Sequence, residues 1–236
     1  MGAHPNLFFP LFRPRSAFND LLVTKKTDIC IEGFPRSANS FSVQAFRYAQ
    51  PESVRVAHHT HVPANAMRAC EWQIPTVILI RSPADAIVSR VALAKEVRMT
   101  EHGVESPQQR ISFSTWIHSW RSFYRALVPY RDRQQLLVAP FAAVIQDMGR
   151  VIEHVNAHFG TSFVPFEHTE ENVSAVRTSQ GYHAGPNERR TKLKADTRAD
   201  FDKALRTNAS LQGQLDAAEQ LFDSYVKKAA IGTSAS

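Results

Sequence analysis

A short apolar strand that runs directly into a phosphate-type loop is the feature of this sequence that most constrains its fold. The stretch reads Ile29-Cys30-Ile31-Glu32-Gly33-Phe34-Pro35-Arg36-Ser37-Ala38-Asn39-Ser40-Phe41. Compared with the nucleotide-binding pattern G-x-x-x-x-G-K-[ST], Gly33 and Ser40 are in register, whereas Ala38 replaces the second glycine and Asn39 replaces the lysine. The sequence therefore predicts a strand, a sharp turn and a helix, without the lysine that contacts a γ-phosphate.

The helix that follows this loop is expected to present its N-terminus to an anion. The backbone N–H groups of residues 37–41 lie at that end, where unpaired amides favour negative charge. The positive charge of the loop is Arg36, which lies inside it. This arrangement indicates a nucleotide whose labile group is something other than a γ-phosphate.

The length and composition of the chain are those of one globular domain. The 236 residues suffice for a single α/β domain over 1–236, with residues 1–27 expected to form an irregular N-terminal arm. The net charge of +6 and the pI near 9.5 favour an anionic ligand, and less strongly a nucleic acid or a membrane surface. No run approaches the ~20 apolar residues of a membrane span, and the two cysteines give no disulfide framework. A cytoplasmic location is expected.

Strands alternate with helices along the chain. Apolar runs predict strands near 28–33, 53–59, 76–80 and 136–138, and periodic segments predict helices near 40–48, 64–70, 143–159, 196–207 and 211–229, with two more that start near 83 and 113. This alternation predicts a P-loop-type parallel β-sheet flanked by helices on both faces. In such a sheet the ligand lies at the carboxyl ends of the strands.

The helix that starts near residue 83 has a clear N-terminal signal. Ser82 can cap it, Pro83 suits the first helical position, and Asp85 completes a capping box. The polar segment 98–112, which contains Gly103 and Pro107, is expected to form a loop or lid.

Arg81 and Ser89 are candidate anion ligands at the end of the third expected strand. Arg81 ends the apolar run 76–80, and Ser89 lies two turns into the following helix, so that both can meet on one anion. The alternative is an arginine that pairs with a helix C-terminus and a serine that faces solvent.

The histidine-rich segment 58–61 lies at the end of the second expected strand. With the period of two of a strand, His59 and His61 share one face, while His58 and Thr60 share the other. A zinc site is the alternative, but no nearby Cys, Asp or Glu completes a ligand set, so no metal site is expected.

Three segments together resemble the sulfotransferases that use 3′-phosphoadenosine 5′-phosphosulfate (PAPS). Phe34-Pro35-Arg36-Ser37-Ala38-Asn39-Ser40-Phe41 is similar to their [YF]-P-[KR]-[SA]-G-[TN]-[TS]-[WF] loop. Ile80-Arg81-Ser82-Pro83-Ala84-Asp85-Ala86-Ile87-Val88-Ser89 is similar to their R-[ND]-P-x-D-x-x-V-S element, and His59-Thr60-His61-Val62-Pro63 is similar to K-T-H-L-P. The resemblance is good over about residues 28–90 and looser over 113–160.

The resemblance implies a PAPS-dependent sulfotransferase that transfers a sulfuryl group in line to a hydroxyl or amine. The acceptor would be a small molecule, lipid or carbohydrate, and neither a metal nor a nucleic acid partner is implied. The implied catalytic residues are His61 as the base, Arg36 at the leaving group and His59 near the sulfuryl oxygens. The implied donor-binding residues are Arg36, Ser37, Ala38, Asn39, Ser40, Phe41, Arg81 and Ser89, with Arg189, Arg190 and Lys192 as substitutes for the basic C-terminal signature of the family.

The sequence also departs from the family pattern. Ala38 stands in place of a glycine, and His59 stands in place of a lysine. Phe141-Ala142-Ala143 replaces the Y-E-D that usually follows the fourth strand, which leaves the adenine contact in doubt.

Two other functions are compatible with parts of the sequence. A small-molecule or nucleotide kinase would share the fold, but it would require ATP and Mg²⁺, and Asn39 argues against it. A non-catalytic protein that binds nucleic acid or a membrane surface would show binding that collapses with salt.

Overall fold

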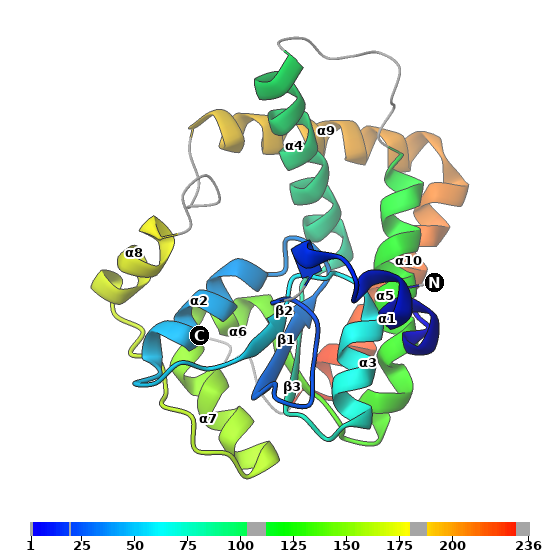
Figure 1. The fold of residues 1–236 in the computed structure, drawn as a ribbon. Coiled ribbons are helices and arrows are strands. Elements are labelled where there is room, and N and C mark those ends of the chain that lie inside the picture. Colours follow the sequence, from blue (N-terminus) through cyan, green and yellow to red (C-terminus); the bar gives the residue numbers. More distant parts are fainter. Residues whose placement is uncertain (1, 19, 103–111, 180–187, 230–236) are drawn as a thin grey trace.

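The computed structural model describes residues 2–18, 20–102, 112–179 and 188–229, and in them a parallel four-stranded sheet forms the centre of the molecule (Figure 1). The strands are β1 (Ile29–Gly33), β2 (Val56–His58), β3 (Thr76–Ile80) and β4 (Leu137–Pro140), in the spatial order β2-β1-β3-β4. All three pairings are parallel, and the pairing of β1 with β3 places Gly33 opposite Leu79. The predicted P-loop-type parallel sheet is confirmed.

Helices connect and cover the strands. They are α1 (Pro5–Phe12), α2 (Asn39–Ala49), α3 (Pro63–Glu71), α4 (Pro83–His102), α5 (Phe113–Asp132), α6 (Phe141–Gln146), α7 (Met148–Phe159), α8 (Glu170–Thr178), α9 (Glu188–Thr207) and α10 (Ala209–Val226). None of the helices in the described part of the chain is long and apolar enough to cross a bilayer.

The sheet has an apolar core on each face because its strand residues alternate between the two faces. Cys30, Ile78 and Ile80 pack with α3, α4, α5 and α10 on one face. Ile31 and Leu79 pack with α2, α6 and α7 on the other. This double cover explains why the strands read as continuous apolar runs, and it confirms the expected helices on both faces.

Two local signals set the ends of helices, and the first, the Ser82 cap of α4, acts as predicted. The Ser82 hydroxyl accepts a hydrogen bond from the Asp85 amide (3.4 Å), directly before Pro83, the first residue of α4. Gly160 ends α7 in the left-handed conformation with φ 67°, and its amide donates to the Asn156 carbonyl (2.8 Å).

Other expectations were wrong. The N-terminal arm was expected to be irregular, yet residues 5–12 form α1, in which Pro10 removes one backbone donor but buried Phe8 and Phe9 anchor the helix. The single helix expected over 143–159 is two helices, because Asp147 ends α6 and its side chain caps α7. Residues 98–102 continue α4, and 103–111 lie outside the described residues, so the expected lid is not tested.

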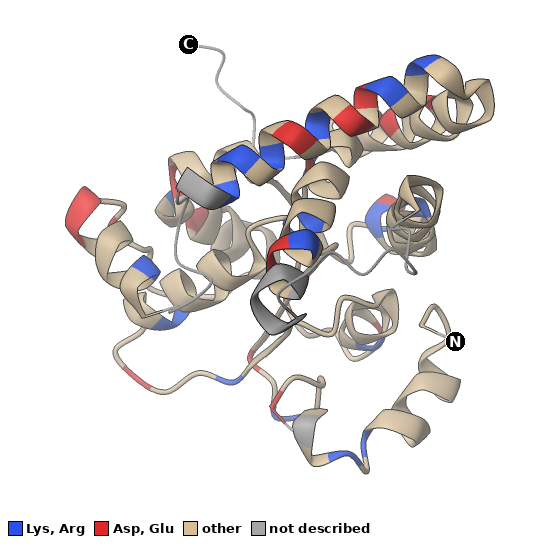
Figure 2. Cartoon of the chain, turned by 90° about the horizontal axis from the view of Figure 1, so that it is seen from above, with Lys and Arg blue, Asp and Glu red and all other residues tan. Residues whose placement is uncertain are grey.

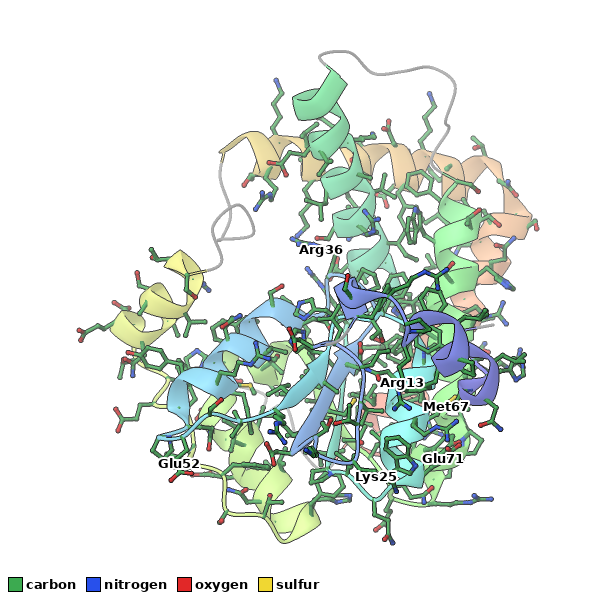
Figure 3. All side chains as sticks on the ribbon, viewed as in Figure 1. Arg13, Lys25, Arg36, Glu52, Met67 and Glu71 are labelled. Carbon is green, nitrogen blue, oxygen red and sulfur yellow. The ribbon has the colours of Figure 1, made fainter. Side chains whose placement is uncertain are left out.

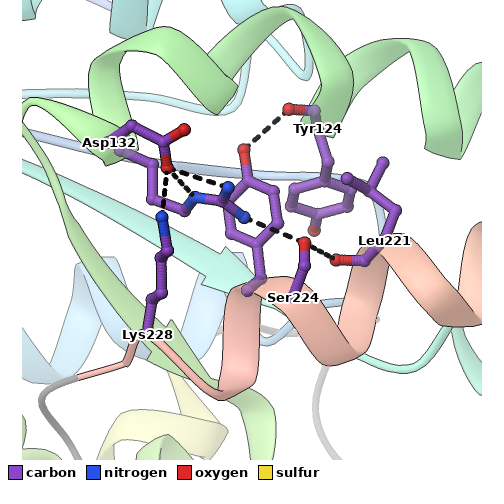
Figure 4. A network of polar contacts seen from close by, with 7 residues as sticks. Tyr124, Asp132, Leu221, Ser224 and Lys228 are labelled. Carbon is purple, nitrogen blue, oxygen red and sulfur yellow. Dashed lines mark hydrogen bonds and ion pairs between the residues drawn. The ribbon is translucent and has the colours of Figure 1, made fainter.

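α10 is attached to α5 by a polar network at the end of the chain (Figure 4). The Tyr225 hydroxyl donates to the Tyr124 carbonyl (2.7 Å), and Arg131 donates to the Ser224 hydroxyl (3.0 Å). Tyr124 in turn donates through its own hydroxyl to the Leu79 carbonyl in β3 (2.8 Å). The C-terminal helix is thus connected through α5 to the central sheet.

Gly33 is predicted to be required where β1 passes β3. A Cβ at this position would lie 2.7 Å from the Leu79 carbonyl oxygen, which is backbone and cannot move away cheaply. Gly33→Ala should therefore lower the free energy of unfolding by about 1–3 kcal/mol, measured by urea denaturation. Gly213→Ala is the matched control, since nothing lies within 4 Å of its Cβ and alanine favours the interior of α10, so this variant should be slightly stabilised. Equal effects of the two substitutions would contradict the steric argument.

Candidate active site

The polar residues predicted from the sequence gather at the carboxyl edge of the sheet. The loop after β1, the histidine segment after β2 and Arg81 after β3 all leave the sheet at this edge. Figure 3 shows Arg36 above the end of β1, beside the first turns of α4.

The loop of residues 34–38 has a strained backbone. Arg36 and Ala38 both have φ 72°, in the left-handed region that side chains with a Cβ disfavour by about 1–2 kcal/mol. Ala38, in place of the usual glycine, is the N-cap of α2 and gives it no side-chain cap. The helix therefore begins without a side-chain oxygen over its first amides.

The amides that face outward from α2 begin later than predicted. The Ser37 amide donates to the Phe34 carbonyl (3.2 Å), so it closes the turn instead of pointing at an anion. The Ser42 amide donates to the Ala38 carbonyl (2.9 Å), so Asn39, Ser40 and Phe41 precede the first helical bond. These three residues carry the orphan amides of the helix N-terminus.

The side chains of this stretch differ in their roles. Asn39 donates through Nδ2 to the Phe34 carbonyl (3.0 Å), while its buried Oδ1 has no hydrogen-bond partner. Phe41 packs edge-on against Phe166, with ring centroids 6.2 Å apart, so its side chain belongs to the core. Ser40 instead contacts the histidine segment, with its Oγ 3.0 Å from His59 Nε2.

Arg36 brings together the two other predicted anion ligands. Its Nε donates to the Ser89 hydroxyl (3.0 Å), and its carbonyl accepts from Arg81 Nη1 (3.2 Å). Arg81 lies over the Phe141 ring, 4.1 Å from Cζ to the centroid, and its carbonyl accepts from Trp120 (3.3 Å). Arg81 and Ser89 thus both contact Arg36, and their meeting on one anion stays a prediction.

Positive charges crowd this part of the site. Burial lowers the pKa of Arg36, and the nearby charges of Arg190 and Arg81 lower it further. Burial, together with the charge of Arg81, also lowers the pKa of Lys194. Because guanidinium groups remain charged, a bound anion would relieve this repulsion.

The three C-terminal candidates all lie in α9, which packs against α4 and carries basic residues in its first turns, followed by a mixture of acidic and basic residues (Figure 2). Arg190 forms an ion pair with the buried carboxylate of Glu96 (2.8 Å) while remaining close enough to affect Arg36. Lys192 is exposed, and the side chain of Arg189 lies outside the described residues. Arg190 is thus the candidate that the structure brings to the site.

The histidine segment does not continue the strand as predicted. β2 ends at His58, and both His59 and His61 have positive φ, 56° and 53°. The His59 and His61 rings are neighbours, as expected, with centroids 5.6 Å apart. His58 was expected on the opposite face, but its ring lies 4.8 Å from that of His59, because the alternation of a strand ends where the strand ends.

A buried carboxylate holds this segment in place. Glu32, fully buried in β1, accepts hydrogen bonds from the amide (3.0 Å) and hydroxyl (2.6 Å) of Thr60 and from the His61 amide (3.3 Å). It also accepts a hydrogen bond from the side-chain Nδ2 of Asn65 (3.0 Å), and the Oδ1 of Asn65 accepts one from the Val23 amide (2.8 Å). Glu32 thereby joins the histidine segment, α3 and the N-terminal arm.

The hydrogen bond of His61 fixes its tautomer. Its Nδ1 lies 2.9 Å from the Gly33 carbonyl oxygen, which can only accept. Nδ1 therefore carries a hydrogen, and in the neutral ring Nε2 presents a lone pair, as a general base requires. Among the described residues, no three or more His, Cys, Asp or Glu side chains are grouped so as to hold a metal ion.

The comparisons with known proteins agree with this geometry. The sequence matches the family model of the sulfotransferase domain over residues 11–207. The chain belongs to the sulfotransferase family. The structure is similar to mouse sulfotransferase SULT7A1 complexed with PAP, with a TM-score of 0.50, 10% sequence identity, and coverage of 88% of this chain and 92% of that chain. A search of curated proteins gives no match.

Membership of the sulfotransferase family supports sulfotransferase activity in general, and the shared fold agrees with it. Some residues that shape the site of this sulfotransferase were not predicted from the sequence. Glu32 and Asn65 hold the histidine segment, and Arg90 lies over the Trp116 ring, 4.7 Å from its centroid. One signal was present for Glu32, namely a charged residue inside an apolar strand, which must be paired when it is buried.

Glu32→Gln is predicted to destabilise the histidine segment. Oε1 can remain the acceptor for Thr60 and Asn65, but the new amide group then faces the His61 N–H, so that two donors oppose each other. The free energy of unfolding should fall by about 1–3 kcal/mol in urea denaturation. The same change at exposed Glu52, on the rim of the molecule (Figure 3), should leave it nearly unchanged. A fully stable Glu32→Gln variant would show that the carboxylate is not needed.

Proposed function

We propose that this sulfotransferase transfers a sulfuryl group from PAPS to a hydroxyl or amine, with His61 as the general base. The observation that carries the proposal is the position of Arg36, held between Ser89 and Arg81 at the N-terminus of α2. The loop at the N-terminus of α2, which suits one phosphate, thus lies beside Arg81, whose positive charge suits a second anion. PAPS carries two such separate anionic groups, a 5′-phosphosulfate and a 3′-phosphate.

The residues present fit this donor. The orphan amides of Asn39, Ser40 and Phe41 suit the 5′-phosphate. Arg81 and Ser89 suit the 3′-phosphate, and Arg190 contributes positive charge nearby. Asn39 would contact the phosphate through its backbone N–H, since its side-chain amide donates to the Phe34 carbonyl within the loop.

The transfer needs positioning and charge stabilisation more than covalent chemistry by the protein. PAPS supplies an electrophilic sulfuryl group whose bond to the 5′-phosphate breaks as the bond to the acceptor oxygen or nitrogen forms. Arg36 stabilises the charge that builds on the bridging oxygen. His61 Nε2 takes the proton of the acceptor, oriented by its bond to Gly33.

The proposed acceptor is a small molecule, lipid or carbohydrate. Transfer proceeds without a metal because sulfate carries one charge fewer than a terminal phosphate. The proposed location is the cytoplasm.

A thermal-shift comparison of nucleotides tests the donor. At 100 times its Kd, 3′,5′-adenosine bisphosphate should stabilise the protein by ~2.7 kcal/mol. This stabilisation should exceed that by AMP or by ATP with Mg²⁺. Preferential stabilisation by ATP with Mg²⁺ would favour a kinase.

Arg81→Ala is predicted to weaken binding of 3′,5′-adenosine bisphosphate much more than binding of AMP. A charge-assisted hydrogen bond contributes ~1.5–3 kcal/mol, so a loss of about ten- to hundredfold is expected for the bisphosphate in calorimetric titration. Arg125→Ala, which removes an exposed arginine from α5, is the charge-matched control and should change neither affinity by more than about twofold. An equal loss for both nucleotides would assign Arg81 a structural role.

His61→Ala and Arg36→Ala are predicted to differ in kind. A base acts on the proton of the acceptor, so loss of His61 should lower kcat by ~10²–10⁴ with little change in nucleotide affinity. Loss of Arg36 should lower both kcat and nucleotide affinity, because its charge faces the donor in the ground and transition states alike. His154→Ala, on α7, serves as the control with one histidine fewer. Near-normal turnover of His61→Ala would show that His61 is not the base and that another group has this role.

A further inference from the structure

Four side chains form a continuous hydrogen-bonded line beside the phosphate loop. Arg47 Nη2 lies 3.2 Å from His58 Nε2, His58 Nδ1 lies 2.6 Å from His59 Nδ1, and His59 Nε2 lies 3.0 Å from Ser40 Oγ. Ser40 and Arg47 are two turns apart in α2 and therefore lie on the same face of it. The two histidines, from the end of β2, bridge that face from one end to the other.

Arg47 determines the direction of every hydrogen in this line. A guanidinium group can only donate, so His58 Nε2 must accept and His58 Nδ1 carries the hydrogen. His58 then donates to His59 Nδ1, so His59 carries its hydrogen on Nε2 and donates to Ser40. A doubly protonated histidine at either position would place two hydrogens in one contact.

The electrostatic surroundings support a neutral His58. Burial lowers the pKa of His58 to about 3, with the neighbouring His59, Arg47 and His61 acting in the same direction. His58 is then neutral at physiological pH, which the hydrogen-bond pattern requires.

The line ends on a hydroxyl group at the N-terminus of α2. Ser40 accepts from His59, so its own hydrogen is directed elsewhere, and Ser40 is also one of the residues that carry an orphan amide. We infer that Arg47, acting through His58 and His59, fixes the Ser40 hydroxyl as a donor to the anion bound at this loop. Arg47 and the two histidines are thus positioning residues. The identification of that anion as the 5′-phosphosulfate rests on the proposed function, whereas the direction of the line does not.

This inference changes the role of His59. The family pattern has a lysine at this position, and a lysine would donate directly to a sulfuryl oxygen. Both ring nitrogens of His59 are engaged by His58 and Ser40, so His59 passes polarisation to the serine instead. A hydroxyl polarised in this way donates more strongly.

The first test is a direct measurement of the tautomers in the ligand-free protein. Long-range ¹H–¹⁵N NMR spectra, assigned with single histidine variants, should show His58 as the Nδ1–H form and His59 as the Nε2–H form at pH 7. Arg47→Lys keeps a pure donor and should preserve both, whereas Arg47→Met should release the His58 tautomer. His58 in the Nε2–H form, or a cationic His59, in the wild-type protein would overturn the inference.

The second test asks whether Arg47 acts through Ser40. Arg47→Met and Ser40→Ala should each weaken binding of 3′,5′-adenosine bisphosphate by about tenfold, and the double variant should be little weaker than either. Additive losses would show that Arg47 acts through its charge alone and would overturn the relay. Arg55→Met removes an exposed arginine before β2 and should leave affinity within about twofold. If the wild-type protein does not bind the bisphosphate, the proposed function fails, while the tautomers still decide the direction of the line.

Discussion

The active-site geometry depends on the hydrogen bonds that the buried carboxylate of Glu32 accepts. Glu32 lies in the central strand, one residue before Gly33, and accepts hydrogen bonds from two separate parts of the chain, the segment of Thr60 and His61 and the helix that carries Asn65. A buried carboxylate without partners would cost several kcal/mol, and with four donors that cost is offset. The strand that starts the phosphate loop therefore also positions His61, the proposed base.

The loop shows how a phosphate-binding motif changes when its lysine is lost. Asn39 takes the position of the lysine and turns back to the Phe34 carbonyl, so it stabilises the loop itself. The charge moves to Arg36, which lies against Ser89 of α4, the helix after the neighbouring strand β3. The cation is thus held between the two proposed anion subsites. This placement suits a donor with two separated anionic groups better than one with a single chain of phosphates.

The sequence predicted well those features that depend on local chemistry. The strand at 76–80 has the predicted bounds, and the capping signal at Ser82 starts α4, because burial on both faces and N-cap hydrogen bonds are encoded by adjacent residues. Arg81 and Ser89 were predicted to share one anion because the ends of parallel strands meet at one edge. The structure brings both side chains to Arg36, and the shared anion stays a prediction.

The features that were missed depend on contacts between distant segments. α1 forms despite Pro10, since its aromatic residues pack on the rest of the chain. α9 begins at Glu188, earlier than predicted, and ion pairs connect it to α4, from Arg190 to Glu96 and from Arg198 to Asp85. The face occupied by His58 was predicted from the period of a strand, but β2 ends at this residue. Periodicity does not reveal where a strand stops when the stop is imposed by a carboxylate on another strand.

Backbone strain is concentrated at the same place as the proposed chemistry. Arg36, Ala38, His59 and His61 all have positive φ, and each lies in a segment that faces the N-terminus of α2. Such conformations cost of order 1–3 kcal/mol each and persist where the surroundings enforce them. Here the enforcing contacts are the bonds of Glu32, the turn closed by Phe34 and the line from Arg47 to Ser40. These contacts hold donors and the candidate base in fixed directions before any ligand binds. This fixed orientation is what the proposed in-line transfer would require, and a histidine pair contributes to it where the family pattern has a lysine.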